Sequence, residues 1–245
     1  PTAAPDGCHV VPASNSSATV LHTLWKTCED VKVKRLCAVE ATDLIVREHV
    51  VVGLQTSSGV IAAQNVVLAT GGKSYPELGA TGSGYGLAAR AGHTVIDPLP
   101  VLVPLTTRET WPRELSGVSL DQVRAWIDLP RQNKCGYTGD MLFTRSGVSG
   151  PVILNLSRDV VPLLRKHGEV PVRLNLQPQT SAGQWNARFD EWSSVHARKK
   201  IANLLDQQLP ASLVKALLHL AGVPGGQSAA SFSRPQREGL RSLLT

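Results

Sequence analysis

One run of residues constrains the fold more than any other part of the chain. Residues 65–70, Asn-Val-Val-Leu-Ala-Thr, are apolar on both faces, which is typical of a central parallel strand buried between two layers. The run stops at Gly71 and Gly72. Glycines at a strand end let ligand atoms lie against bare backbone, although such a turn is more often only structural. The sequence therefore predicts an α/β fold with main chain open to a ligand at one place.

A glycine-rich loop follows this run. Residues 71–86 contain six glycines, and residues 87–92 have the pattern of a helix closed by a glycine. Residues 84–89 formally match the G-x-G-x-x-A variant of the dinucleotide fingerprint, but that fingerprint needs a buried strand directly before it. Here a polar loop intervenes, so we interpret the match as a plain helix start. The free N–H groups near Thr81 could still face an anionic or carbonyl group.

The segment before this loop predicts a helix and a β-meander. Apolar residues between positions 18 and 26 recur at helical spacing, after a loop rich in proline and serine. Short runs rich in β-branched residues then predict three or four strands, at residues 31–40, 44–48, 50–56 and 60–62.

Prolines mark the first expected domain boundary. Four of them interrupt the apolar stretch between residues 97 and 112, which favours an extended crossover over a helix. We expect residues 1–105 to form the first domain, 106–180 a small β-rich domain and 181–245 a helical subdomain. Strands of the β-rich domain are predicted at residues 119–129, 141–144, 152–156 and 170–176.

The end of the chain has helical character. Residues 185–209 and 211–220 carry helical spacing, and Ser233 stands three positions before Gln236, which predicts a capping box at the start of a last helix. Three consecutive cations, residues 198–200, are expected within the first of these helices. They are interpreted as a solvated face, with phosphate contact as the alternative.

Charge and cysteine content narrow the partners and the compartment. The chain has 25 Lys and Arg against 19 Asp and Glu, a net charge of +6 that favours anionic partners without implying nucleic acid. The cysteines at positions 8, 28, 37 and 135 have no C-x-x-C pair or recurring spacing, so we expect free thiols in a reducing, cytoplasmic compartment and no structural zinc. No apolar run reaches the roughly 18 residues of a membrane span, so no membrane association is expected.

Familiar catalytic patterns are absent from the sequence. Residues 147–150, Gly-Val-Ser-Gly, are not a G-x-S-x-G nucleophile elbow, and the seven histidines never fall at a metal-like spacing. The segment 143–151 could cap a pocket, but a link between two strands is the preferred interpretation. The N-terminus shows neither an initiator Met nor a signal peptide, which indicates that the chain begins inside a longer protein.

Several motifs together resemble a known family. A-T-G-G-x-S-Y-P at 69–76, T-G-x-G-Y at 81–85 and L-F-T-x-x-G-x-S-G-P at 142–151 resemble the bacterial flavoproteins predicted to be NAD(P)/FAD-dependent oxidoreductases. Aminoacetone oxidase and a bile-acid dehydro-reductase belong to that family. The resemblance covers nearly the whole chain, more loosely in the helical tail.

The resemblance implies part of an FAD-binding domain of dinucleotide type, interrupted by an inserted small β-barrel and a helical subdomain. The pyrophosphate-binding glycines of that family would precede position 1, and the segment that closes over the flavin would follow position 245. We therefore expect an internal fragment, which alone holds FAD weakly or not at all and is inactive.

The resemblance also implies the site residues. Ala69, Thr70, Gly71 and Gly72 would lie against FAD, with Thr81 and Gly82 near the flavin or the substrate. No catalytic acid or base is assigned. Ser74 and Tyr75 are candidates near the flavin ring, because a hydroxyl on a glycine-flanked loop can hydrogen-bond a substrate carbonyl or amine. The alternative is that Tyr75 packs and Ser74 caps a turn.

The implied function of the complete protein is FAD-dependent transfer of hydride or electrons between FAD and a small organic substrate, with NADH or NADPH as a further redox partner. Nucleic acid is not the expected partner. The rival hypothesis is a non-enzymatic interaction module, in which the basic helices of residues 185–245 bind an anionic partner or nucleic acid. The substrate, the choice of nicotinamide and the oligomeric state stay open.

Overall fold

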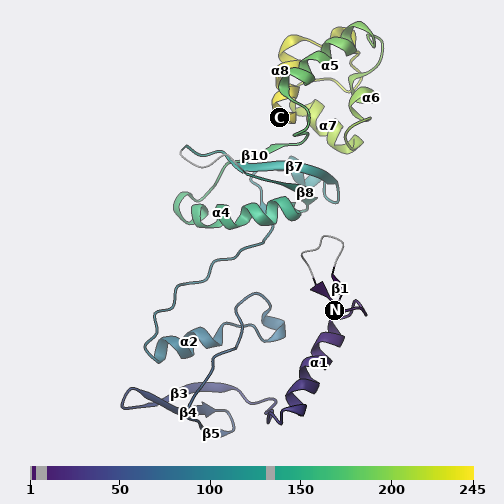
Figure 1. Cartoon of the computed structure of the whole chain (residues 1–245). Coiled ribbons are helices and arrows are strands. Elements are labelled where there is room, and N and C mark those ends of the chain that lie inside the picture. Colours follow the sequence, from purple (N-terminus) through teal and green to yellow (C-terminus); the bar gives the residue numbers. More distant parts are fainter. Residues whose placement is uncertain (1, 4–9, 131–135) are drawn as a thin grey trace. The chain divides into compact units, whose positions relative to one another are not determined.

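The structure is a computed structural model that describes residues 2–3, 10–130 and 136–245 (Figure 1). The chain forms two compact units, residues 1–96 and residues 97–245. The sequence had predicted the first boundary between positions 105 and 106, and the compact units divide between positions 96 and 97.

The described residues of unit 1, which covers residues 1–96, form two small antiparallel sheets and two α-helices. In chain order its elements are β1 (Thr2–Ala3), β2 (Val10–Val11), α1 (Ser17–Asp30), β3 (Ala41–Arg47), β4 (Val50–Thr56), β5 (Gly59–Ala62), the short 3-10 helix η1 (Pro76–Leu78) and α2 (Ser83–Arg90). β1 pairs with β2, and β3, β4 and β5 form a meander in that order. Cys28 and Cys37 are free thiols, whereas positions 8 and 135 lie outside the described residues.

The predicted helix and most of the predicted meander are confirmed. α1 covers the expected residues, and three of the four expected strands form as β3, β4 and β5. The strand predicted at 31–40 is wrong. Lys32 and Ala38 have φ angles of 58° and 56°, in the left-handed region, which breaks the extended backbone that a strand needs.

The buried strand predicted at residues 65–70 is also wrong. This segment has no regular structure, and all its residues except the half-buried Val66 are exposed, with Val67 at 85% of its maximum. From residue 64 to residue 74 the backbone makes no hydrogen bond to any described residue. A strand requires a neighbouring strand to receive its hydrogen bonds, and the described sheets of unit 1 offer none to this segment.

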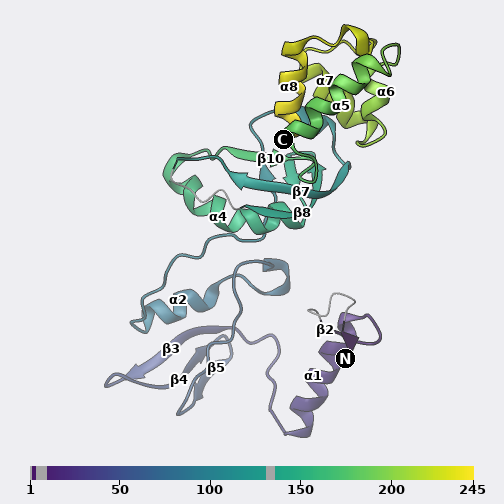
Figure 2. The same cartoon turned by 45° about the horizontal axis from the view of Figure 1, so that its top comes forward.

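Unit 2, residues 97–245, begins with an antiparallel sheet. Its strands are β6 (Leu105–Thr106), β7 (Ser119–Ile127), β8 (Tyr137–Thr144), β9 (Gly147–Ser149) and β10 (Val172–Asn175), in the order β10-β7-β8-β9-β6. The short helix α3 (Trp111–Glu114) and the long helix α4 (Pro151–His167) accompany it, and α4 lies along one face of the sheet (Figure 2). The sheet forms a half-barrel, in agreement with the predicted small β-rich domain.

One predicted strand of this unit is a helix. Residues 152–156 begin α4, because Pro151 suits the first helical turn and Gly150 precedes it with a φ of 94°. The buried side chains of α4 recur at helical spacing rather than alternating: Val152, Ile153, Leu156, Ser157, Val160 and Val161. Residues 143–151 form the β8–β9 hairpin and the entry to α4, so their preferred interpretation as a link is confirmed.

The end of unit 2 is helical, as predicted. Its helices are α5 (Ala182–Ser194), α6 (Ile201–Leu205), α7 (Ala211–Leu220), the 3-10 helix η2 (Ala229–Ser231) and α8 (Arg234–Leu244). α8 starts where the capping box was expected, and the backbone N–H of Ser233 donates to Gln236 Oε1 at 3.1 Å. The cations at 198–200 were predicted to lie within one helix over residues 185–209. In the structure α5 ends at Ser194, and the cations lie in the loop between α5 and α6.

An aromatic cluster holds the helical part together. The ring of Phe189 lies 5.7 Å from Trp185, 5.4 Å from Trp192 and 5.3 Å from Phe232, measured between centroids. All four side chains are buried and belong to one core with β7, β8 and α4. Among the described residues, no helix has the length and apolar character that crossing a membrane demands.

Candidate functional site

The segment Ala69, Thr70, Gly71 and Gly72 presents bare main chain. Ala69, Thr70 and Gly71 are exposed, and their backbone polar groups make no hydrogen bond within the described chain. Gly71 has a φ of 75°, and among the described residues beyond its chain neighbours a methyl group added there would meet only the Cβ of Ala80, at 3.8 Å. Because these N–H and C=O groups have no internal partner, they are free to bind a ligand or a neighbouring chain segment.

The first turn of α2 lies against this segment. A Cβ on Gly84 would overlap Thr70 Oγ1, so only glycine allows the Thr70 side chain to pack there. Gly72 also faces α2: a Cβ added to Gly72 would lie 3.5 Å from the Tyr85 hydroxyl oxygen. Unit 1 therefore brings together the two segments that the sequence predicted for the cofactor, residues 69–72 and the helix start near Gly82.

Lys73 lies beside the candidate site and was not among the predicted site residues. Its aliphatic stem lies against Gly82, the residue before α2, which has a φ of 79°. Its ammonium lies 5.8 Å from the centre of the Tyr85 ring, within cation–π range. Lys73 thus places a positive charge beside the glycine segment. The position of this lysine directly after Gly71 and Gly72 in the sequence could have indicated its place beside the site.

Ser74 and Tyr75 stand on the surface of the loop. The Tyr75 side chain is 61% exposed, and its hydroxyl has no partner among the described residues, so Tyr75 does not pack. Ser74 is exposed and its side chain caps no turn. The Tyr75 backbone carbonyl accepts hydrogen bonds from Leu78 and Ala80, which fixes the loop at η1. Thr81 is exposed beside this loop, before Gly82.

An ion pair fastens α2 to the meander. Arg90 Nε lies 3.1 Å from Asp43 Oδ1, and Arg90 Nη2 donates to the Thr42 carbonyl at 2.8 Å. The hydrogen bond from Arg90 holds the pKa of the Asp43 carboxyl below its usual value, helped by the Leu44 backbone N–H. The ion pair therefore orients the helix whose first turn faces Thr70.

We expect the pKa of Asp43 to rise toward its ordinary value in Arg90→Gln. A carboxyl whose pKa is lowered by folding stabilises the fold above its unfolded pKa, and this contribution is lost as the pH falls through the lowered value. A carboxyl-carbon NMR titration measures the shift. Arg47→Gln, on the same strand, should leave the Asp43 pKa unchanged; an unchanged pKa in Arg90→Gln would contradict the assignment.

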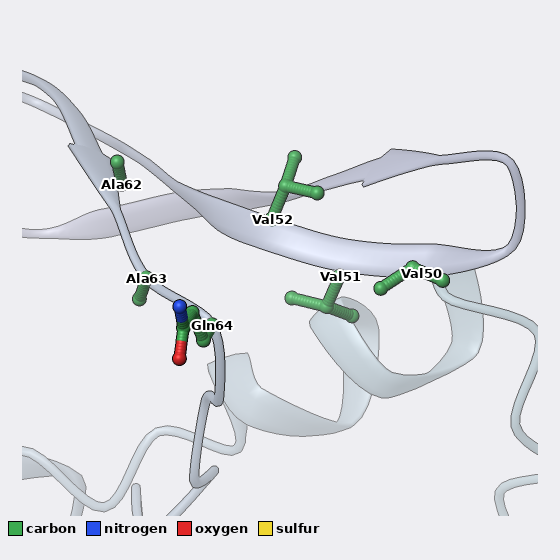
Figure 3. A pocket seen from close by; sticks show the side chains of 6 residues that line it. All are labelled: Val50, Val51, Val52, Ala62, Ala63 and Gln64. Atoms are coloured by element: carbon green, nitrogen blue, oxygen red, sulfur yellow. The ribbon is translucent and has the colours of Figure 1, made fainter.

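A hollow of unit 1 lies away from these residues. It has a volume of about 430 Å³ and is lined by Val50, Val51, Val52, Ala62, Ala63 and Gln64, none of them a predicted site residue (Figure 3). Val51 and Val52 point to opposite sides of β4, as neighbouring residues of a strand do (Figure 3). The lining offers no titratable group. Within the part of the chain that the structure describes, no group of His, Cys, Asp and Glu could hold a metal ion.

The charge of the chain is unevenly divided. Residues 1–96 contain 7 Lys and Arg and 7 Asp and Glu, whereas residues 97–245 contain 18 and 12. The entire excess of +6 therefore belongs to unit 2. The net charge of the whole chain does not reveal this division, which depends on where the two units meet in the sequence.

Comparison with known proteins identifies the family. A family model described as an HI0933-like protein barrel and H2TH domain matches residues 99–245, more than half of the chain. The chain belongs to the HI0933-like family. This result confirms the flavoprotein resemblance of the motifs and the half-barrel followed by helices in unit 2.

Curated relatives of this HI0933-like chain have two kinds of name. The 3-dehydro-bile acid delta(4,6)-reductase of Clostridium scindens is 30% identical over 98% of this chain and 59% of its own length. The ribosomal RNA dihydrouridine synthase of Haemophilus influenzae is 40% identical over 78% of this chain and 44% of its own length. The Escherichia coli enzyme of the same name is 31% identical over 70% of this chain and 40% of its own length. The chain thus spans about half the length of these relatives.

Proposed function

We propose that the full-length protein is an FAD-dependent reductase that saturates a carbon–carbon double bond next to a carbonyl group. The observation that carries this proposal is family membership together with the relatives' names. A 3-dehydro bile acid with double bonds at positions 4 and 6 has those bonds conjugated to its 3-carbonyl. Uridine has a ring double bond next to a carbonyl, and dihydrouridine is its reduced form. The two names describe one type of reaction.

This reaction sets requirements on the protein. Hydride adds to the carbon remote from the carbonyl, negative charge develops on the carbonyl oxygen, and a proton then adds to the carbon next to the carbonyl. Hydrogen-bond donors at that oxygen stabilise the transition state. The exposed hydroxyls of Ser74 and Tyr75 are the groups in unit 1 that we propose for this role. Either could also hold the proton.

The open backbone of unit 1 suits a flat cofactor. Ala69, Thr70, Gly71 and Gly72 present backbone groups that have no hydrogen-bond partner among the described residues, and Thr81 and Gly82 lie directly before α2. When bound, FAD would supply the hydride, and NADH or NADPH would restore it. The positive charge of Lys73 beside the segment favours an electron-rich ring or a phosphate. In this proposal, residues of the full-length protein outside these 245 would complete the FAD-binding site.

We further propose RNA, rather than a small free molecule, as the substrate class. Two of the relatives are named for ribosomal RNA, and the whole net positive charge of the chain lies in residues 97–245. A basic surface attracts a polyanion by releasing its condensed counterions, an effect that a single steroid acid cannot give. A cytoplasmic location agrees with this substrate and is part of the proposal.

The experiment uses the full-length protein under anaerobic conditions. The flavin is first reduced with NADH or NADPH, and the protein is then given either a uridine-containing ribosomal RNA or a steroid 3-ketone conjugated to double bonds at positions 4 and 6. Mass spectrometry should find uridine that has gained two hydrogens. If only the steroid is reduced, the proposed reductase activity stands and RNA is rejected as its substrate. A protein that binds RNA but never holds flavin would support the rival interaction module.

A further inference from the structure

We infer that the outer face of the β7–β10 strand pair binds an unpaired base of RNA and its phosphates. We call this surface the Trp126 face and define it by Arg124, Trp126, Asp128 and Arg173. The inference rests on the proposed RNA substrate and adds the place at which the protein contacts it. None of these residues belongs to the candidate flavin site of unit 1.

Strand alternation places these side chains on one side of the sheet. On β7 the side chains of Val123, Ala125 and Ile127 are buried in the core, so the intervening Arg124 and Trp126 point outward. Arg173 of β10 is directly opposite Trp126 in the antiparallel register. Side chains of opposed residues share a face, so Arg173 and Trp126 are neighbours on the outer surface.

The side chains of the Trp126 face are held in position. The Arg124 guanidinium lies 5.6 Å from the centre of the Trp126 ring, and Arg173 Nη2 donates to Asp128 Oδ2 at 2.8 Å. Together the four residues line a shallow hollow of about 320 Å³. The half-buried indole thus has Arg124 near its ring and Arg173 directly opposite it on β10, and these contacts restrict the side chains before any ligand arrives, which lowers the entropy cost of binding.

This chemistry fits a nucleic acid base better than a protein or a lipid. Single-strand-binding proteins stack bases on exposed aromatic rings and Arg guanidinium planes, and they pair phosphates with cations. The Trp126 face offers all three elements. Asp128 disfavours a phosphate at its own position but uses only part of the donor capacity of Arg173, because a guanidinium has five N–H groups. We therefore place the base on Trp126 and the phosphates beside Arg124 and Arg173.

The test measures RNA binding to the full-length protein by fluorescence anisotropy. The probe is a labelled oligouridine of about 12 nucleotides, within the site sizes that single-strand-binding folds cover. Trp126→Thr should raise Kd about tenfold, the effect of losing one stacked base, and Trp126→Phe should restore most of the affinity. Arg173→Gln should weaken binding and reduce the salt dependence by about one phosphate contact.

Controls separate the Trp126 face from general charge and from the proposed function. Arg108→Gln removes an exposed arginine of the same unit, paired with Glu169 at 3.0 Å, and should leave Kd within about twofold of the wild type. Heparin, a polyanion without bases, should bind Trp126→Thr as well as the wild type. The inference would be overturned if Trp126→Thr lost as much affinity for heparin as for RNA, or if its RNA binding were unchanged. Either result would leave the proposed reductase function standing. Absence of RNA binding by the wild type would reject the RNA substrate itself, whereas flavin reduction would still test the reductase.

Discussion

Gly71→Val should weaken FAD binding by the full-length protein by about tenfold or more. Gly71 has a φ of 75°, and a β-branched residue in that conformation costs about 1 to 3 kcal/mol of strain. The new side chain would also stand on the backbone against which we propose that the cofactor lies. Because Ala80 is the only described residue, apart from the two chain neighbours, within 4 Å of the added Cβ, little else is disturbed. Flavin absorbance per protein after gel filtration measures the loss.

Gly79→Val is the matched control for this prediction. Gly79 belongs to the same loop and has a φ of 92°, and no described residue other than its chain neighbours comes within 4 Å of an added Cβ. It therefore carries the same backbone strain without touching the proposed cofactor surface. We expect Gly79→Val to retain nearly all of its flavin. Equal flavin content in the two variants would remove Gly71 from the site.

Phe189→Ala should lower the free energy of unfolding of unit 2 by about 3 to 5 kcal/mol. Phe189 is fully buried, and its ring touches Trp185, Trp192 and Phe232, so truncation leaves a cavity at the centre of the cluster. Urea unfolding followed by far-ultraviolet circular dichroism measures the change without depending on the aromatic signal. Val195→Ala, at a side chain 69% exposed after α5, should change stability by less than about 0.5 kcal/mol. A loss below about 1 kcal/mol for Phe189→Ala would contradict the packing.

Local signals were sufficient where an element depends on its own residues. α1 and α7 were predicted from helical spacing, and α8 from the capping box of Ser233 and Gln236. Capping and periodicity act within one or two turns, so a sequence displays them directly. The meander was also predictable, because β3, β4 and β5 are consecutive strands joined by tight turns.

Two strand predictions were wrong because contacts beyond the local sequence decide whether a segment forms a strand. Residues 65–70 have the composition of a buried strand, but no described strand accepts their hydrogen bonds, and the sequence could not show this. In residues 152–156 a β-branched run suggested a strand, yet the spacing of Val152, Leu156 and Val160 continued through a whole helix. A longer window would have favoured the helix.

The candidate site was partly predictable. The double glycine and the helix start near Gly82 were visible as motifs, and the structure brings them together through the contact of Thr70 with Gly84. That contact required the fold, as did the position of Lys73 over the Tyr85 ring. The Trp126 face was not predictable, because the register of β7 with β10 joins residues that lie far apart in the sequence.

The visible absorption spectrum of the full-length protein tests the central claim most directly. The protein is incubated with FAD, passed through gel filtration and compared with the 245-residue chain treated in the same way. The account predicts that the full-length protein keeps the two visible bands of an oxidised flavin, and that the 245-residue chain loses them. A colourless full-length protein would contradict flavin dependence.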